Sequence, residues 1–148
     1  IHFKGHYHGN KKSIQFRESR KFFVKIHESF ISHLILLNGN LANEAEKSNI
    51  TACETNTSLI GEAKDCNIHH CNTNIYLIER NAINCSINFC HTNTALISEF
   101  ADHCTISDCL VTLKEKNRAS IRIFSEFSGI SRILRNKSIV QRCFIIYN

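Results

Sequence analysis

Apolar residues recur along this chain at intervals of 17 to 19 positions, and three columns of identical residues define the repeat. Alanine forms the first column, at Ala45, Ala63, Ala82, Ala101 and Ala119. Isoleucine forms the second, at Ile14, Ile31, Ile50, Ile68, Ile87, Ile106 and Ile123. Leucine forms the third, at Leu41, Leu59, Leu77, Leu96 and Leu113. A fixed period of about 20 residues is typical of proteins that stack one supersecondary unit on copies of itself.

Within each repeat the apolar residues are spaced by two, which is the period of a β-strand. Cys66 and Ile68 flank the polar Asn67, for example, and the same alternation returns at residues 85 to 87 and 104 to 106. Equivalent strands should therefore lie parallel and in register on successive turns. We predict an all-β, single-domain parallel β-helix, or β-solenoid, with a period of 18 to 19 residues. About eight turns, each adding about 4.8 Å, would make a rod about 40 Å long.

The repeat resembles that of the parallel β-helix proteins, the broad pectin-lyase-like group, over residues 14 to 145. The resemblance rests on the repeat and on no catalytic signature. The turns are shorter than is usual for the polysaccharide-processing members, and the chain has only five glycines. We therefore expect asparagine to supply the left-handed backbone of the corners. The candidates are Asn56, Asn74 and Asn93, whose amides should also hydrogen-bond along the axis.

The single domain, residues 1 to 148, divides into three parts by the regularity of its repeat. Residues 1 to 30 are irregular or form a cap, 31 to 125 form regular turns, and 126 to 148 form the last turns or a second cap. Phe23, Ile26, Phe30 and Leu34 stand at helical spacing, yet Phe22, Val24 and Ile26 alternate as in a strand. Because the ends of a solenoid need caps, both a capping helix and an irregular turn fit this segment.

Seven of the eight cysteines follow the repeat. They form two columns, Cys66, Cys85, Cys104 and Cys53, Cys71, Cys90, Cys109. Three pairs share an i, i+5 spacing that could close a disulfide across a corner, provided that the two Cα atoms come within about 7 Å. The alternative is that each free thiol is a small buried residue of the core. Disulfides, and four Asn-x-Ser/Thr sequences at Asn49, Asn56, Asn84 and Asn136, would suit an extracellular or cell-surface protein.

Charge is segregated along the chain. Residues 1 to 25 carry seven bases and one acid, 26 to 116 carry five bases and eleven acids, and 117 to 148 carry six bases and one acid. A nucleic-acid interface would need basic and aromatic residues along one face, so this distribution does not predict one. No apolar run is long enough to span a membrane. The chain contains no methionine, and we expect it to be a processed product or a piece of a longer protein or assembly.

Candidate chemistry is sparse. His69, His70 and Cys71 are adjacent, but no paired ligand spacing predicts a metal site, and we expect no cofactor. Glu44 and Glu62 share a column one turn apart, which is the kind of carboxylate pair that a glycan hydrolase needs. Asn81 and Phe100 follow them in that column, so a solvated face is the simpler interpretation, and no catalytic residue is predicted.

Threonines suggest a binding surface instead. Thr55, Thr57, Thr73, Thr92 and Thr94 recur on successive turns in an arrangement that resembles the threonine arrays of β-solenoid antifreeze proteins. We predict a non-enzymatic structural or surface-binding module that presents stacked columns of side chains to a repeating partner, either a glycan or a protein. The alternatives are an ice-binding solenoid and a glycan lyase or hydrolase of the pectin-lyase-like group.

Overall fold

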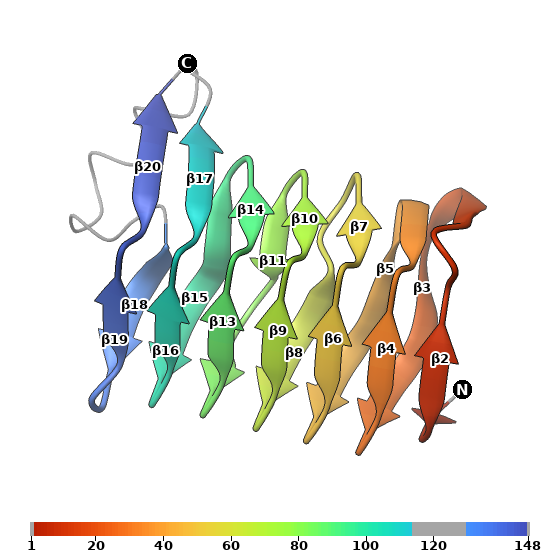
Figure 1. Cartoon of the computed structure of the whole chain (residues 1–148), viewed down its shortest axis with the longest axis horizontal. Helices are drawn as coiled ribbons and strands as arrows, with labels where there is room; N and C mark the ends of the chain where they lie inside the picture. The colour runs from red at the N-terminus through yellow and green to blue at the C-terminus, as the bar shows by residue number, and fades with distance from the viewer. Residues whose placement is uncertain (1, 114–129, 148) are drawn as a thin grey trace.

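The chain is a parallel β-solenoid of about six turns in a computed structural model that describes residues 2 to 113 and 130 to 147 (Figure 1). Two sheets run along the axis, one of seven strands and one of thirteen. The strands are β1 His2–Phe3, β2 His6–His8, β3 Ser13–His27, β4 Phe30–Ser32, β5 Ile35–Glu46, β6 Asn49–Thr51, β7 Glu54–Thr55, β8 Ile60–Lys64, β9 Asn67–His69, β10 Asn72–Thr73, β11 Tyr76–Ile78, β12 Ala82–Ile83, β13 Ser86–Asn88, β14 His91–Thr92, β15 Ala95–Asp102, β16 Thr105–Ser107, β17 Leu110–Leu113, β18 Ser131–Arg135, β19 Ile139–Gln141 and β20 Phe144–Tyr147.

The seven-stranded sheet consists of three-residue strands, β2, β4, β6, β9, β13, β16 and β19, paired in register. Their central residues form one inward column: Tyr7, Ile31, Ile50, Ile68, Ile87, Ile106 and Val140. The predicted isoleucine column is thus confirmed from Ile31 to Ile106. Ile14 pairs instead with Leu36 in the other sheet, and Ile123 lies outside the described residues.

The count is about six turns rather than eight because the end turns are longer than the central ones. Successive central residues are 18 or 19 positions apart from Ile31 to Ile106. The interval is 24 residues from Tyr7 to Ile31 and 34 from Ile106 to Val140. Because these end turns use more residues, the chain completes about six turns rather than the predicted eight.

The thirteen-stranded sheet carries the alanine column. Ala45, Ala63, Ala82 and Ala101 are register partners across β5, β8, β12 and β15, with Ile26 before them and Leu134 after them. Ala119 lies outside the described residues. Leu41, Leu59, Leu77 and Leu96 are all buried, but Leu113 leaves their column and pairs with Tyr147 in β20.

The N-terminal segment is a strand and not a helix. The fifteen-residue β3 pairs with both β5 and β1, but the alternation of Phe22, Val24 and Ile26 does not set its burial, because Val24 is 49% exposed while Phe23 and Ile26 are buried. Aromatic rings then close this end of the core: Phe3 stacks on Phe23 at 4.6 Å between ring centroids, and Tyr7 packs edge-on against Phe22 and Phe23. No helix occurs in the described residues, so none of them could form a membrane-spanning helix.

Residues with left-handed backbone lie at both ends of β4, β6, β9, β13 and β16, and one follows β19. Before the strand they are Glu28, Lys47, Asp65, Asn84 and His103, and after it they are His33, Ala52, His70, Phe89, Asp108 and Arg142. Each costs about 1 kcal/mol or more of conformational free energy. Their N–H groups recover hydrogen bonds on the next turn, as when Asp65 N donates to Ile83 O at 2.9 Å.

The prediction that Asn56, Asn74 and Asn93 supply the left-handed backbone is therefore wrong, because none of them has a positive φ. The turns they occupy are wider bends. The predicted amide ladder is present in part: Asn93 Nδ2 donates to Asn74 Oδ1 at 2.6 Å, and Asn56 Nδ2 donates to Asn38 Oδ1 at 3.2 Å.

All eight cysteines are free. The members of each i, i+5 pair stand on opposite sides of a three-residue strand, about 10 Å or more apart, which is too far for a cross-corner disulfide, and the alternative of free buried thiols holds for these pairs. Each column instead runs along the axis. Leu34 begins the second column, and Cys143 joins it after Cys109, since Phe144 N donates to Cys109 O at 2.9 Å, as Leu110 N does to Cys90 O.

Candidate functional site

The strongest candidate site is a groove on the outer face of β3, β5, β8 and β12. Strand alternation turns the alanines inward and places charged side chains on both sides of them, as in Glu44-Ala45-Glu46. The volume of the groove is about 230 Å³. We call it the central groove, and its lining consists of Lys25, Glu44, Ala45, Glu46, Glu62, Ala63, Lys64, Asn81 and Ile83.

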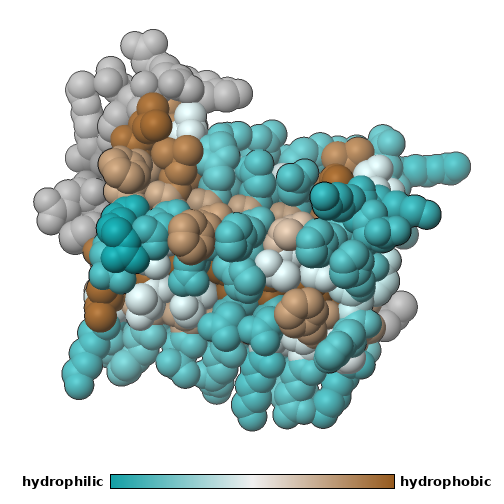
Figure 2. Space-filling model, viewed as in Figure 1, coloured by the Kyte–Doolittle hydropathy of each residue, from teal (hydrophilic) through white to brown (hydrophobic). Residues whose placement is uncertain are grey.

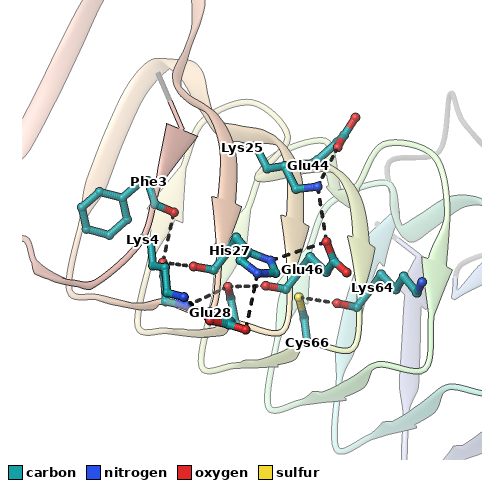
Figure 3. Close-up of polar contacts among 11 residues, drawn as sticks. Phe3, Lys4, Lys25, His27, Glu28, Glu44, Glu46, Lys64 and Cys66 are labelled. Atoms are coloured by element: carbon teal, nitrogen blue, oxygen red, sulfur yellow. Dashed lines mark hydrogen bonds and ion pairs between the residues drawn. The ribbon is translucent and has the colours of Figure 1, made fainter.

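Ion pairs cross the central groove between neighbouring turns (Figure 3). Lys25 Nζ lies 3.3 Å from Glu46 Oε2 and 3.7 Å from Glu44 Oε2. Arg80 Nε donates to Glu62 Oε1 at 3.0 Å. The hydrogen bond from Lys25 lowers the pKa of Glu46, and this carboxyl is therefore ionised at neutral pH. The groove thus presents carboxylates as fixed hydrogen-bond acceptors.

The polar network continues toward the N-terminal end. His27 Nδ1 lies 3.5 Å from Glu46 Oε2, and His27 Nε2 lies 3.4 Å from Glu28 Oε1. Lys4 pairs with Glu28, and its hydrogen bond lowers the pKa of that carboxyl. Figure 3 shows Lys4, His27, Glu28, Glu46 and Lys25 as one connected series of contacts. Charged groups therefore follow the axis over several turns.

Two groups in the central groove have no partner in the described part of the chain. Asn81 Oδ1 is buried and accepts no hydrogen bond there. Lys64 Nζ makes no ion pair with any described carboxylate. A buried polar atom without a partner costs about 1 to 3 kcal/mol. The lining of the groove therefore holds an unsatisfied acceptor beneath its surface and, at its surface, a lysine without an ion-pair partner among the described carboxylates.

The predicted carboxylate pair lies in this groove. Glu44 and Glu62 are register partners on β5 and β8, so their Cα atoms are about 4.8 Å apart. Each already has a cationic partner, since Lys25 Nζ lies 3.7 Å from Glu44 Oε2 and Arg80 Nε lies 3.0 Å from Glu62 Oε1. A glycan hydrolase needs one of its two carboxyl groups protonated. Among the described residues no group of three or more His, Cys, Asp or Glu could hold a metal ion.

The five threonines of the predicted binding surface do not form one exposed array. The expectation that these residues face outward is wrong for Thr55, Thr73 and Thr92, which are 6%, 2% and 0% exposed. They are register partners on β7, β10 and β14 and point into the core. Thr55 Oγ1, for example, donates to Gly39 O at 2.9 Å. Thr57 and Thr94 are half-buried. Binding by these five residues stays a prediction, and three of them present no exposed hydroxyl.

The opposite face, which carries the seven-stranded sheet, is mainly hydrophilic in Figure 2. Exposed apolar residues lie at Phe30 on β4, at Phe89 after β13 and at Ile139 on β19, and Phe144 and Ile146 of the adjacent β20 add to them at the C-terminal end.

Sequence reasoning found Glu44 and Glu62 and placed Asn81 in their column without a role, but it missed Lys25, Glu46 and Lys64. The signal was available, because Lys25, Glu44, Glu62 and Asn81 are spaced by 18 or 19 residues and strand alternation places them on one face. No known family, no curated protein and no solved structure matches this chain. Its function is therefore inferred from the geometry of the groove.

Proposed function

We propose that this β-solenoid is a non-enzymatic binding module that holds a hydroxyl-rich glycan along the central groove. The observation that carries the proposal is the buried, unpartnered Asn81 Oδ1, beside carboxylates that repeat at one-turn intervals. A hydroxyl group that donates to Asn81 would remove the cost of this buried acceptor.

The ion pairs of the groove leave room for such a ligand. Exposed ion pairs of this kind contribute about 0 to 1 kcal/mol to stability, so a ligand can replace one at little cost. Carboxylate and amide oxygens outnumber the cations in the lining. A glycan that donates hydrogen bonds, either neutral or bearing amines, therefore suits the groove better than an acidic one. Its repeating units would meet equivalent side chains on successive turns.

Glycan binding can be measured by calorimetry with oligomers of β-linked glucose, xylose, N-acetylglucosamine and glucosamine. We expect at least one of these neutral or amine-bearing oligomers to bind. Asn81→Ala together with Glu62→Ala should weaken that binding about tenfold or more, since two hydrogen bonds, one of them to a charged group, are removed.

A matched control is available on the other sheet. Asn49 and Asn67 are exposed on β6 and β9, and Asn49→Ala with Asn67→Ala should leave the affinity unchanged. Equal affinity in the groove variant and the parent would place the site elsewhere. Failure of the whole panel to bind at millimolar concentration would overturn the proposal.

The same incubations test hydrolysis, which the stacked Glu44 and Glu62 favour as a second candidate function. Release of new reducing ends that is lost in Glu62→Gln would support a hydrolase. Unchanged oligomers would support binding alone.

A further inference from the structure

Two imidazole rings meet at the corner that follows β9, on a different side of the rod from the central groove. His69 Nδ1 lies 3.1 Å from His70 Nδ1. Thr51 Oγ1, on the preceding turn, lies 3.1 Å from the same His69 nitrogen. Thr51 and His69 are register partners, so the solenoid itself brings these groups together.

The backbone explains why two adjacent residues point the same way. Successive side chains of a strand normally point to opposite faces. His70, however, adopts a left-handed backbone conformation, with a φ of 56°, and the chain turns there directly after β9. Its ring stacks on Phe89 of the next turn, with 5.1 Å between the ring centroids and 16° between the planes. The small Ala52 occupies the equivalent position on the preceding turn, so solvent reaches the rings from that side.

Hydrogen bonding within this cluster is incomplete. A neutral imidazole Nδ1 carries either one N–H or one lone pair, so His69 Nδ1 can form only one of its two short contacts as a good hydrogen bond. The other contact brings polar atoms together without a shared proton. A cation placed between the nitrogen lone pairs would satisfy both rings at once.

We propose that His69, His70 and Thr51 form a surface site for one divalent transition-metal ion of the copper, nickel and zinc class. Imidazole nitrogens bind these ions at about 2.0 to 2.1 Å. Two nitrogens separated by 3.1 Å would subtend about 100° at such an ion, which lies between square-planar and tetrahedral geometry. The Thr51 hydroxyl and water would complete the coordination. His70 is exposed and His69 is half-buried, so an ion enters directly from solvent.

Residue spacing did not predict this site, because its donors are two adjacent histidines and a threonine from another turn. Cys71, the third residue of the run, takes no part, because its side chain is buried in the core. The site is independent of the proposed glycan binding, and either can fail without the other.

The test uses Cu²⁺, the divalent ion of this class that such ligands bind most tightly. In amide NMR spectra of the chain, substoichiometric Cu²⁺ should broaden signals around Thr51, His69, His70 and Phe89. His69→Ala and His70→Ala should each lower the affinity at this site about tenfold or more, and Zn²⁺ should compete for it. Phe89→Leu keeps both histidine ligands but removes the ring that stacks on His70. We expect it to lower the Cu²⁺ affinity less than His70→Ala does.

His103→Ala is the matched control, because His103 is an exposed left-handed histidine at another corner. It should leave the broadening around His69 unchanged. If His69→Ala does not fold by circular dichroism, the exposed His70→Ala carries the test. The proposal is overturned if the signals around His69 and His70 are unaffected by excess Cu²⁺, or if folded His70→Ala responds as the parent does.

Discussion

Serine and cysteine both occur in the first cysteine column and make the same hydrogen bond there. Ser48 Oγ donates to the carbonyl two residues earlier, Glu46 O, at 2.8 Å. Cys66 Sγ and Cys85 Sγ make the same contact, to Lys64 O at 3.2 Å and to Ile83 O at 3.3 Å. What the position requires is a small side chain that can donate to its own corner.

The isoleucine column depends on shape and burial instead. Ile87 is fully buried between Ile68 and Ile106, and we expect Ile87→Ala to lower the free energy of unfolding by about 2 to 5 kcal/mol. Urea denaturation measures this loss. Ile75→Ala is the control, since Ile75 is 41% exposed and its truncation should cost far less. Equal losses in the two variants would contradict the assignment of the column to the core.

At the scale of elements, the three-residue strands resume their register after a long interruption. The interval between β16 and β19 is much longer than one period, yet Thr105 pairs with Ile139 and Ile106 with Val140. A bidentate ion pair joins the corners of these two turns: Arg142 Nε donates to Asp108 Oδ1 at 2.7 Å, and Arg142 Nη2 donates to Asp108 Oδ2 at 2.8 Å. The last turn is therefore held by its charges as well as its backbone.

Acid should weaken this last turn. The hydrogen bond from Arg142 lowers the pKa of Asp108 below its ordinary value of 3.8. A carboxyl with a depressed pKa in the folded state contributes stability above its unfolded pKa and loses it as the pH falls through the folded pKa. We expect faster amide exchange in β19 and β20 below about pH 4.

Arg142→Gln should raise the NMR-measured pKa of Asp108 toward its ordinary value and bring the faster exchange to neutral pH. Lys137→Gln is the control, because Lys137 lies near the same end and makes no ion pair with a described carboxylate. An unchanged pKa for Asp108 in Arg142→Gln would refute the role of the pair.

At the scale of the whole molecule, the seven-stranded sheet has a terminal strand at each end among the described residues. β19 ends the seven-stranded sheet at one end, and β2 ends it at the other. Open strand edges favour association with further strands. The chain is rich in bases near both ends, from Lys4 to Lys25 and from Arg118 to Arg142. We predict that repulsion between these like charges opposes end-to-end stacking of copies.

Removal of this charge should promote filaments. We expect glutamine at Lys11, Lys12, Arg17, Arg20 and Lys21 to increase light scattering and to give elongated particles in electron micrographs. Salt at 1 M should act in the same direction on the parent, since it reduces the screening length to about 3 Å. Lys47→Gln, at a corner in the middle of the rod, should have no effect. Monomeric behaviour of the five-fold variant would argue against this role of the charges.

The sequence by itself determined the repeat, the parallel in-register pairing and the inward columns. In a solenoid the spatial neighbour of a residue is one period away along the chain, and therefore Ala63, Ala82 and Ala101 could be placed together by counting. Strand alternation then separated Glu44 from Ala45. These features follow from the spacing of the repeat and from the two-residue period of a strand. Neither of these depends on contacts between residues more than one repeat apart in the sequence.

Only the tertiary structure decided how each turn bends. Left-handed backbone is available to many residues at a similar cost, so the sequence could not show that Asp65 and His70, rather than Asn74, form the corners. The positions of the bends in turn decide which side chains face inward. They place the Thr73 side chain in the core, keep Cys66 apart from Cys71 and bring the His69 ring against the His70 ring. The addition of Cys143 to its column likewise depended on strand pairing across an interval much longer than the repeat.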